Sequence, residues 1–114
     1  MIIMCQDKRR FVKELPFTTT PGYLSGPGAR EAAGLPEDSG PYRVITQLGV
    51  YGFDEATKRL RLITRHPGVT IEEIQANSEF EISIPDEVPE STPPTPEEQN
   101  ILREIDPTGM VIGK

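Results

Sequence analysis

The chain has 114 residues, with 12 lysines and arginines against 18 aspartates and glutamates, so its net charge is -6. This acidic balance argues against a nucleic-acid-binding protein and against binding to an anionic membrane surface, because both need clustered basic residues. Hydrophobic residues make up only 35% of the chain, beside 12 prolines and 10 glycines, which predicts one domain-sized unit with much loop and a thin core.

No stretch approaches the roughly 18 apolar residues of a membrane helix, and the start lacks the apolar region of a signal peptide, so we expect a cytoplasmic protein. The single cysteine, Cys5, has no partner for an internal disulfide, and no metal-ligand spacing is present. Because Cys5 follows an apolar run, we expect it to be a buried small hydrophobe and not a reactive thiol.

The first five residues, Met1–Cys5, are apolar and predict a buried strand. A chain seldom begins with a bare, fully hydrophobic strand, so we expect further protein before it. Residues 6–12 are expected to form a turn or short helix. Phe17–Thr20 predicts a β-branched strand that ends at Pro21-Gly22.

Glycines and prolines punctuate residues 22–41, which predicts a long loop, and Ala29–Ala33 within it predicts one helical turn closed by Gly34. After this loop, Tyr42–Phe53 and Lys58–Thr64 are two β-rich runs separated by four turn-forming residues. They predict a β-hairpin. In the second run leucines alternate with arginines, which is the period of a half-buried strand.

The next residues, His66–Gly68, are expected to end that strand. Thr70–Glu73 has the pattern of a helix-capping box and predicts a short helix that buries Ile71 and Ile74. In Phe80–Ile84 apolar and polar residues alternate, which predicts another half-buried strand.

Five prolines and three acidic residues over residues 85–96 predict an extended acidic arm, stiffened towards polyproline II. A second capping box, Thr95–Glu98, has proline at the first helical position, where its missing N–H costs nothing. The helix that follows carries Ile101, Leu102 and Ile105, which we expect to form core or subunit contacts. An Asp-Pro pair is expected to end it.

Six ordered phrases of this sequence resemble one protein family. They are Asp7–Val12, Thr20–Leu24, Gly28–Pro36, Val44–Val50, His66–Thr70 and Pro93–Pro107. The same series is similar to the C-terminal stretch of the B (β) subunit of family I CoA-transferases, such as glutaconate and 3-oxoacid CoA-transferases. One phrase alone is a weak signal, but the ordered series covers nearly the whole chain and is specific.

The resemblance implies an α/β fold: the C-terminal part of an open sheet of the CoA-transferase type (NagB/RpiA/CoA transferase-like), with a β-hairpin, short helices and a proline-rich C-terminal arm. Residues 1–84 are then expected to belong to the domain of the B subunit, and residues 85–114 to be an arm and helix that pack on the same domain. The resemblance also implies transfer of CoA between an acyl-CoA and a carboxylic acid, with coenzyme A as a substrate and no covalently bound cofactor. It implies a partner, the A subunit of the CoA-transferase, and thus a hetero-oligomer.

In the family a glutamate of the B subunit attacks the acyl-CoA thioester and forms an anhydride, then a glutamyl-CoA thioester. No glutamate here matches its motif, so we assign no catalytic residue and expect this chain to be inactive alone. We also expect exposed apolar surface at the first strand and along Leu60 and Leu62, where neighbours would be missing. Two alternatives stay open: a CoA-ester hydrolase or ring-opening relative without the nucleophile, and a non-catalytic module that docks a partner through its acidic arm.

The candidate binding site is a glycine-rich loop. Its residues, proposed as a wall for the CoA phosphates, are Gly22, Tyr23, Gly26, Gly28 and Arg30. Small residues let a backbone approach a phosphate, and a helix start and an arginine favour an anion. The alternative, which the sequence alone favours, is a plain connecting loop with Arg30 in an ion pair.

Two further candidates have ordinary structural explanations. The only histidine, His66, is expected to bond the backbone where a strand ends and not to act as a general base. The cluster Lys8-Arg9-Arg10 is expected to be a solvated turn, with contact to CoA phosphates or to an acidic partner as the alternative.

Overall fold

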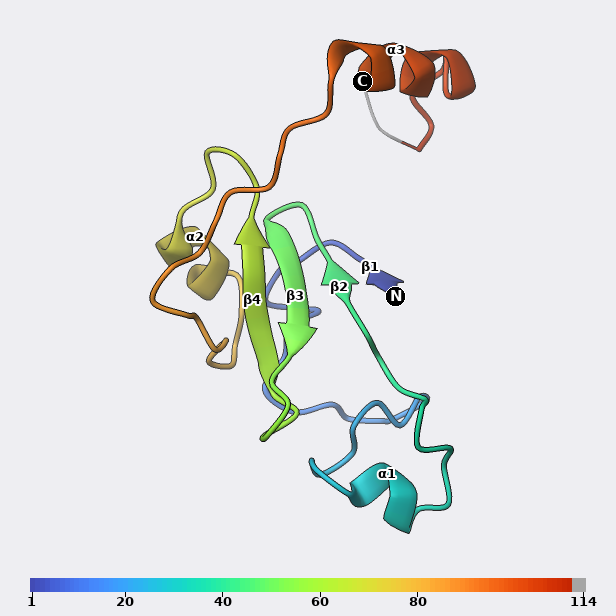
Figure 1. The fold of residues 1–114 in the computed structure, drawn as a ribbon, viewed down its shortest axis with the longest axis vertical. Coiled ribbons are helices and arrows are strands. Elements are labelled where there is room, and N and C mark those ends of the chain that lie inside the picture. The colour runs from blue at the N-terminus through green and yellow to red at the C-terminus, as the bar shows by residue number, and fades with distance from the viewer. Residues whose placement is uncertain (112–114) are drawn as a thin grey trace.

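The computed structural model describes residues 1–111 and shows an open, mixed four-stranded sheet with the strand order β1-β2-β3-β4 (Figure 1). The strands are β1 Ile2–Ile3, β2 Val44–Ile45, β3 Gly49–Phe53 and β4 Leu60–Arg65. The helices are α1 Ala29–Ala32, α2 Ile71–Ala76 and α3 Pro96–Ile105. The expected α/β open sheet with short helices is confirmed. No helix within residues 1–111 is long and apolar enough to span a membrane.

The β3–β4 hairpin forms where the sequence predicts it, and Tyr51 faces Leu62 across the two antiparallel strands. The first run divides into two strands, however, because the Thr46 hydroxyl accepts the backbone N–H groups of Leu48 at 3.1 Å and Gly49 at 3.3 Å. This bonding turns the chain between β2 and β3. A Cβ on Gly49 would lie 2.5 Å from the carbonyl oxygen of Thr64, so the close approach of the two strands requires glycine there.

The helix after the hairpin also begins as expected. Strand β4 ends at Arg65, and the Thr70 hydroxyl accepts the backbone N–H of Glu73 at 3.1 Å, which caps the start of α2. The cap turns Ile74 towards the sheet, where it is fully buried.

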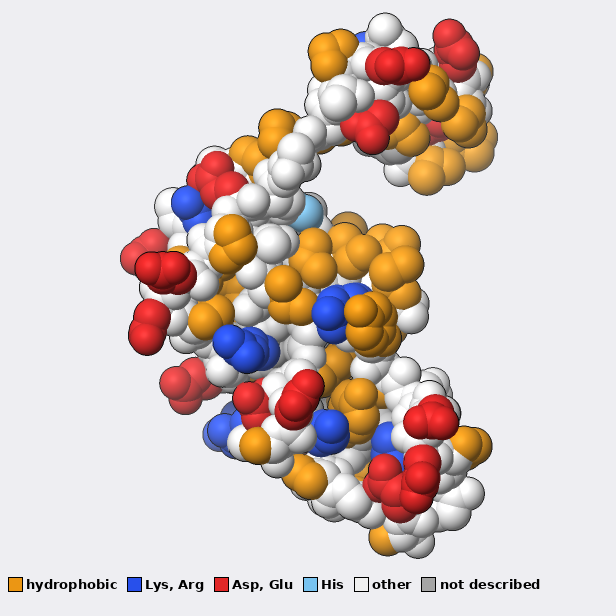
Figure 2. Space-filling view, viewed as in Figure 1, with side chains coloured by type: hydrophobic (Ala, Val, Ile, Leu, Met, Phe, Trp, Pro, Cys, Tyr) orange, Lys and Arg blue, Asp and Glu red, His pale blue; other side chains and the backbone are white. Residues whose placement is uncertain are grey.

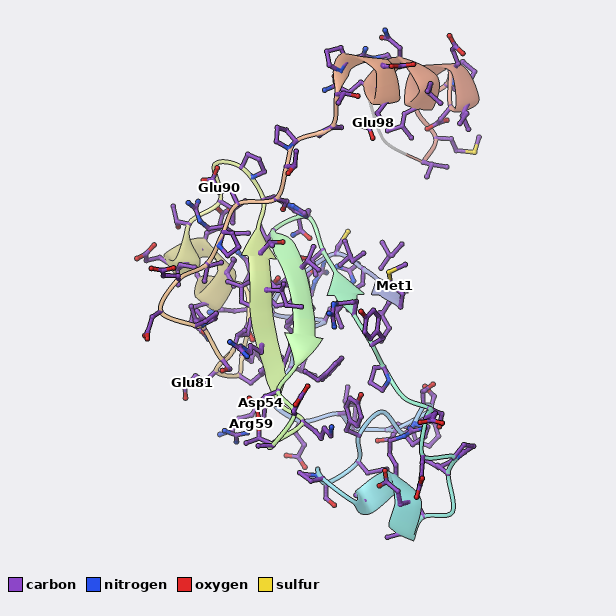
Figure 3. The ribbon with its side chains drawn as sticks, in the orientation of Figure 1. Met1, Asp54, Arg59, Glu81, Glu90 and Glu98 are labelled. Carbon is purple, nitrogen blue, oxygen red and sulfur yellow. The ribbon has the colours of Figure 1, made fainter. Side chains whose placement is uncertain are left out.

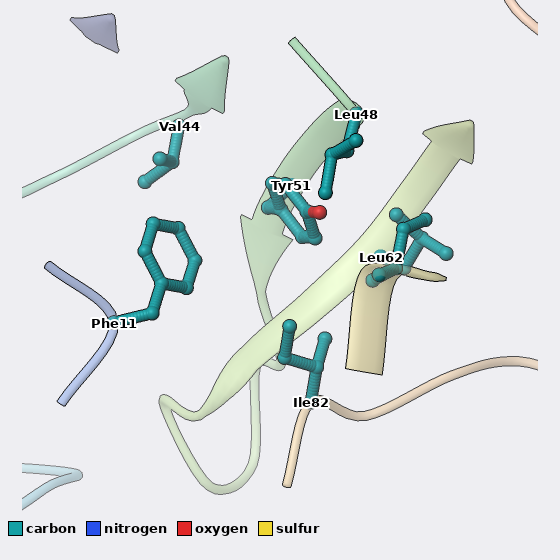
Figure 4. Close-up of a cluster of buried hydrophobic side chains, with 7 residues drawn as sticks. Phe11, Val44, Leu48, Tyr51, Leu62 and Ile82 are labelled. Atoms are coloured by element: carbon teal, nitrogen blue, oxygen red, sulfur yellow. The ribbon is translucent and has the colours of Figure 1, made fainter. Parts of the chain in front are cut away.

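The core lies on one face of the sheet and combines residues from distant parts of the chain (Figure 4). Its members are Phe11, Val44, Leu48, Tyr51, Leu62, Ile74 and Ile82. Leu62 is only 1% exposed, because α2 and the segment around Ile82 cover it. The expectation of an open face along Leu60 and Leu62 is therefore wrong.

Two other expected strands do not form. The segment Phe80–Ile84 makes a single parallel bridge, in which Leu62 donates to the Ser83 carbonyl at 2.9 Å. The alternation still marks burial correctly, since Ile82 is 2% exposed. Phe17–Thr20 contains bends and no strand, and Phe17 is 76% exposed because nothing within residues 1–111 pairs with this segment.

The first strand lies at the sheet edge and pairs only with β2, in parallel. Ile2 is 44% and Ile3 77% exposed, so the expected burial of this segment is wrong for the described residues, and Cys5 is exposed as well. The expected bare, apolar sheet edge is confirmed. It exists because β1 is an edge strand of the described sheet and has no neighbour on its outer side.

The proline-rich arm first follows the free edge of β4 and then leaves the sheet. The backbone N–H of Arg65 donates to the Pro89 carbonyl at 3.1 Å, and that of Ser91 donates to the Arg65 carbonyl at 2.8 Å. Beyond this point the arm carries α3 away from the sheet, and α3 has no buried residue (Figure 1). The expected packing of residues 85–114 on the same domain stays a prediction, and its last residues, 112–114, lie outside the described part.

Candidate functional site

The predicted binding loop is organised around the side chain of Arg30, which is 8% exposed. Its guanidinium donates to the Gly22 carbonyl at 2.6 Å and to the Ser39 hydroxyl at 2.5 Å. Both acceptors are neutral oxygens, so the expected ion pair of Arg30 is replaced by hydrogen bonds that tie the two ends of the loop together. The Nε atom of Arg30 is buried without a hydrogen-bond partner.

The glycines of this loop serve its backbone conformation. Gly28 precedes α1 with φ +75°, a left-handed conformation that residues with a Cβ adopt at a cost. A Cβ on Gly40 would lie 3.2 Å from the Tyr23 ring and 3.4 Å from Arg30 Nε. Because α1 is only one turn long, its N-terminus adds little positive potential.

The folded loop borders a hollow of about 300 Å³ that gathers the predicted residues. Tyr23, Gly26, Gly28 and Arg30 line it directly. Gly22 does not line it, but its carbonyl accepts a hydrogen bond from Arg30. Lys58 adds a second cation, with its Nζ 5.5 Å from the centre of the Tyr23 ring. The lining also contains the carboxylates of Glu31, Glu37 and Asp38. The structure therefore brings the five predicted residues together, in surroundings of mixed charge.

The only histidine joins three segments of the backbone. His66 Nε2 lies 2.9 Å from the Thr46 carbonyl oxygen, and Nδ1 lies 2.8 Å from the Ser91 hydroxyl. Because a carbonyl oxygen only accepts, Nε2 is the donor in the bond to Thr46. The expected backbone bond is confirmed. The link to Ser91 has no sequence signal, because it joins residues that are 25 positions apart.

The basic cluster at the start of the chain is an exposed turn, as expected. The Asp7 carboxylate accepts the backbone N–H groups of Arg9 at 2.9 Å and Arg10 at 3.0 Å. It also pairs with the Arg10 side chain. Lys8, Arg9 and Arg10 are all exposed, so the turn is fixed locally by Asp7.

A buried polar cluster around Gln6 is not among the features that the sequence predicts. Gln6 is 2% exposed and donates to the Ile74 carbonyl at 2.9 Å, while its side-chain oxygen accepts from the hydroxyls of Thr46 and Tyr51. Burial raises the pKa of the Tyr51 hydroxyl, which keeps it a donor at neutral pH. The cluster ties the N-terminal segment to β3 and α2. A lone glutamine after an apolar run gives no signal for this role.

The sheet face opposite the core carries a second hollow, of about 630 Å³. Arg43 and Arg61 line it around Gly52 and Ile63, with acidic residues of the hairpin turn and of the arm at its rim. Arg43 also stacks on the exposed Tyr42 ring, 4.0 Å from its centre. Figure 2 shows hydrophobic side chains gathered over the sheet beside basic ones. The alternation in β4 predicts Arg61 on this face, but it predicts neither Arg43 nor the hollow.

None of the glutamates occupies an enclosed site. All 13 glutamates of the chain are exposed to solvent, whereas a carboxylate that acts as a nucleophile gains from a desolvated pocket. On α3 the backbone N–H of Thr95 lowers the pKa of the Glu98 carboxyl, which reflects a helix cap and not an active site. Among residues 1–111 no three His, Cys, Asp or Glu side chains are grouped to hold a metal ion.

Comparison with protein families and curated proteins gives a consistent result. The family described as "Coenzyme A transferase" matches residues 1–77. The B subunit of glutaconate CoA-transferase from Acidaminococcus fermentans is 38% identical over 107 residues, which is 94% of this chain and 40% of that protein. The B subunit of 3-oxoadipate CoA-transferase from Pseudomonas knackmussii is 33% identical over 106 residues, 93% of this chain and 40% of that protein. The chain thus spans about 40% of the length of these relatives.

Solved structures agree with this likeness. The crystal structure of glutaconate coenzyme A-transferase from Acidaminococcus fermentans matches 99% of this chain with a TM-score of 0.90, and 44% of its own chain is covered. A cholesterol ring-cleaving hydrolase IpdB subunit of Rhodococcus jostii is 33% identical, but over only 60% of this chain and 28% of that protein. The likeness to the glutaconate enzyme is therefore broader and includes the arm and α3.

Proposed function

Because the chain belongs to the coenzyme A transferase family, we propose that it is part of the B subunit of an enzyme that transfers CoA between an acyl-CoA and a carboxylic acid. One observation carries this proposal: the fold matches glutaconate coenzyme A-transferase over 99% of the chain with a TM-score of 0.90. Two curated relatives that match more than nine tenths of the chain are named as B subunits of CoA-transferases. Their names also support a second, different subunit as the partner.

The catalytic carboxylate is proposed to lie in the part of the B subunit that this chain does not contain. A carboxylate suits the reaction because it attacks the thioester carbonyl and expels the CoA thiolate, and the mixed anhydride that forms can be opened at either carbonyl with a carboxylate as the leaving group. The thiolate then attacks the glutamyl carbonyl of the anhydride, which releases the acid and leaves a glutamyl-CoA thioester. All glutamates of this chain are exposed, which supports the proposal that the catalytic carboxylate lies elsewhere in the B subunit.

The chain itself is proposed to supply structure around the active site. Residues 1–84 are proposed to form the sheet domain, and the described part of residues 85–114 forms an arm with a helix. The bare outer edge of β1 is proposed to pair with a strand from the remainder of the B subunit, since exposed Ile2 and Ile3 are poorly suited to solvent. The loop that Arg30 holds together is proposed to form a wall of the CoA site, with Arg30 as a positioning residue.

Transfer is favoured over CoA-ester hydrolysis by the extent of the likeness. The IpdB hydrolase subunit matches 60% of the chain, whereas the two transferase subunits match 94% and 93%. The solved IpdAB structure likewise matches with a TM-score of only 0.53. The matches to the two transferase subunits thus extend over more of this chain than the match to the IpdB subunit.

The proposal is tested with the complete B subunit that carries this chain and its A subunit. Acetyl-CoA serves as donor, and glutaconate or 3-oxoadipate as acceptor, with both CoA esters followed by liquid chromatography. We expect a new CoA ester that appears only with both subunits and an acceptor acid, and none with the 114-residue chain alone. Release of free CoA in the absence of acceptor, without formation of a new ester, would contradict transfer and indicate hydrolysis.

A further inference from the structure

The only histidine of the chain lies where three parts of the molecule meet. Its ring bonds the Thr46 carbonyl, in the turn between β2 and β3, through Nε2 at 2.9 Å. Its Nδ1 atom lies 2.8 Å from the Ser91 hydroxyl on the arm, and its backbone N–H donates to the Leu48 carbonyl at 2.9 Å. The partly buried His66 thus joins the β2–β3 turn, the end of β4 and the arm.

The base of the arm, residues 89–91, is bound to the last residue of β4. Arg65 donates from its backbone N–H to the Pro89 carbonyl at 3.1 Å, and its carbonyl accepts the backbone N–H of Ser91 at 2.8 Å. The Arg65 side chain pairs with Glu90 at 2.7 Å. In Figure 3 the labelled Glu90 lies near the end of β4, whereas the labelled Glu98 of α3 lies away from the sheet. Bonds at this base therefore attach the arm to the sheet.

The Ser91 hydroxyl has one hydrogen but two neighbours that can receive it. Its oxygen lies 3.1 Å from the Arg65 carbonyl oxygen and 2.8 Å from His66 Nδ1. The Thr64 hydroxyl, at 3.5 Å, is too distant to compete. Because Nε2 carries the hydrogen that is donated to Thr46, the direction of the Ser91 hydroxyl depends on whether Nδ1 carries a hydrogen as well.

The two protonation states of the ring give two different bonding patterns. When the ring is neutral, Nδ1 has only a lone pair, so Ser91 must donate to it and the Arg65 carbonyl keeps only the Ser91 backbone N–H. When the ring is charged, Nδ1 donates to the Ser91 oxygen, and the Ser91 hydroxyl is free to donate to the Arg65 carbonyl. The two short distances at the Ser91 oxygen are both hydrogen bonds only in the charged state.

The charges near the ring leave both states accessible. The β2–β3 turn brings Thr46, Gln47 and Leu48 to His66, and none of these is charged. On β4 the neighbouring charge is Arg65, and on the arm it is Glu90, and these two pair with each other. Because the ring is only partly buried, water also reaches its charged form. Histidine is the side chain that ordinarily gains or loses its charge between about pH 5 and pH 8.

We propose that His66 is a proton-operated clasp for the arm. Uptake of a second proton at Nδ1 reverses the hydrogen bond between His66 and Ser91 and turns the Ser91 hydroxyl to the Arg65 carbonyl. The charged ring thus adds one hydrogen bond between β4 and the base of the arm. Attachment of the arm is therefore stronger in acid and weakens as the pH rises and the ring loses its second proton. This inference goes beyond the proposed function, because it concerns the arm and not the transfer of CoA.

The first test locates the hydrogens directly and needs no variant. Crystals of the complete B subunit with its A subunit are soaked in heavy water at about pH 5 and at about pH 8, and neutron diffraction is measured. In acid we expect deuterium on both ring nitrogens of His66 and a Ser91 hydroxyl that points to the Arg65 carbonyl. In alkali we expect a bare Nδ1 and a Ser91 hydroxyl that points to it. The same hydrogen positions at both pH values overturn the proposal.

The second test measures the attachment of the arm. Hydrogen exchange of the same complex is followed by mass spectrometry between about pH 5 and pH 8, with rates corrected for intrinsic exchange and with the amides of β3 as the reference. We expect protection of the Arg65 and Ser91 amides to be about two- to tenfold higher at the acidic end, the effect of one added hydrogen bond. Equal protection at both ends overturns the proposal.

Two variants assign this pH dependence to the ring. His66→Gln keeps a side-chain donor for the Thr46 carbonyl but cannot titrate, so we expect protection that no longer changes with pH. Glu90→Gln removes the charge that pairs with Arg65 and leaves the ring intact, so the pH dependence should persist. A dependence that survives in His66→Gln, or that is lost in Glu90→Gln, overturns the proposal.

The clasp and the proposed function are tested separately. Neither readout uses an acyl-CoA or an acceptor acid. If CoA transfer is observed while the Ser91 hydroxyl keeps one direction, the clasp is wrong and the proposed function stands. If the hydroxyl turns with pH while no CoA is transferred, the clasp stands and the proposed function is wrong.

Discussion

The sheet core and helix α3 are stabilised in opposite ways. Tyr51, Leu62 and Ile74 are at most 1% exposed and come from β3, β4 and α2, so their burial depends on contacts between distant parts of the chain. The bonds that shape α3 join residues within a few positions of one another, as between Thr95 and Glu98. The comparison shows that one region is stable through its own packing, whereas the other is formed by local bonds and leaves its apolar side exposed.

The largest expected difference between the two regions is in the free energy of unfolding when the same substitution is made in both. Leu62→Ala removes a side chain that is 1% exposed, and we expect it to lower the free energy of unfolding by about 2–5 kcal/mol, because a cavity is left in the core. Leu102→Ala removes one that is 43% exposed, and we expect a change within about 0.5 kcal/mol. Urea unfolding followed by tyrosine fluorescence measures both.

Comparable losses for the two leucine variants would contradict the contrast. They would mean that α3 packs on the body of this chain in solution.

A smaller effect is expected in the loop that borders the candidate site. Arg30→Met keeps the length of the side chain but removes its bonds to the Gly22 carbonyl and the Ser39 hydroxyl. We expect a loss of about 1–3 kcal/mol in the free energy of unfolding, because partly buried acceptors lose their donors. In the complete enzyme we expect a raised KM for the acyl-CoA with a smaller change in kcat. An unchanged stability would show that Arg30 does not hold the loop.

The attachment of the arm to the sheet is tested by Ser91→Ala. This variant removes the hydroxyl that bonds His66 Nδ1 at 2.8 Å and the Arg65 carbonyl at 3.1 Å. We expect the free energy of unfolding to fall by about 0.5–1.5 kcal/mol. Hydrogen exchange should become faster at the Arg65 and Ser91 amides and stay unchanged at the amides of the core around Tyr51. Thr92→Ala, at the next and exposed position, is the matched control. Slower or unchanged exchange at Ser91 would contradict the role of this hydroxyl in attaching the arm.

The smallest expected effect is local to the start of α3. The Thr95 N–H lowers the pKa of the Glu98 carboxyl in the folded helix, so the cap is fully present above the ordinary pKa of glutamate and is lost as pH falls through the lowered value. An NMR titration should show the Thr95 amide resonance moving in that acidic range. The movement should disappear in Glu98→Gln and persist in Glu97→Gln. A Thr95 resonance that still titrates in Glu98→Gln would contradict the cap.

The contrast also explains which features the sequence predicts. The helix caps, the hairpin and the strand end before Gly68 depend on neighbouring residues, and the structure has all of them. Thr95 and Glu98 form the complete capping box, whereas at α2 the Thr70 half of the expected box forms. The expected strand at Phe80–Ile84 fails because alternation reports which side chains are buried, not which backbone atoms find a partner. Burial at β1 fails for a similar reason, since β1 has a neighbouring strand on only one side in the described sheet.

The candidate loop shows the same limit. Four of its five residues, Tyr23, Gly26, Gly28 and Arg30, line one hollow, and their role in binding CoA stays a prediction. The expected ion pair of Arg30 is wrong, because the bond to Ser39 depends on how the loop folds back after α1. The cluster around Gln6 gives no local signal at all, since it joins positions 6, 46, 51 and 74.

The central claim is that this chain supplies scaffold but not the nucleophile. The most direct test is to incubate the complete B and A subunits with an acyl-CoA, reduce the covalent enzyme thioester with borohydride, and locate the modified residue by peptide mass spectrometry. The account predicts a modified glutamate of the B subunit outside the 114 residues of this chain. Modification of any of the 13 glutamates within it would contradict the account.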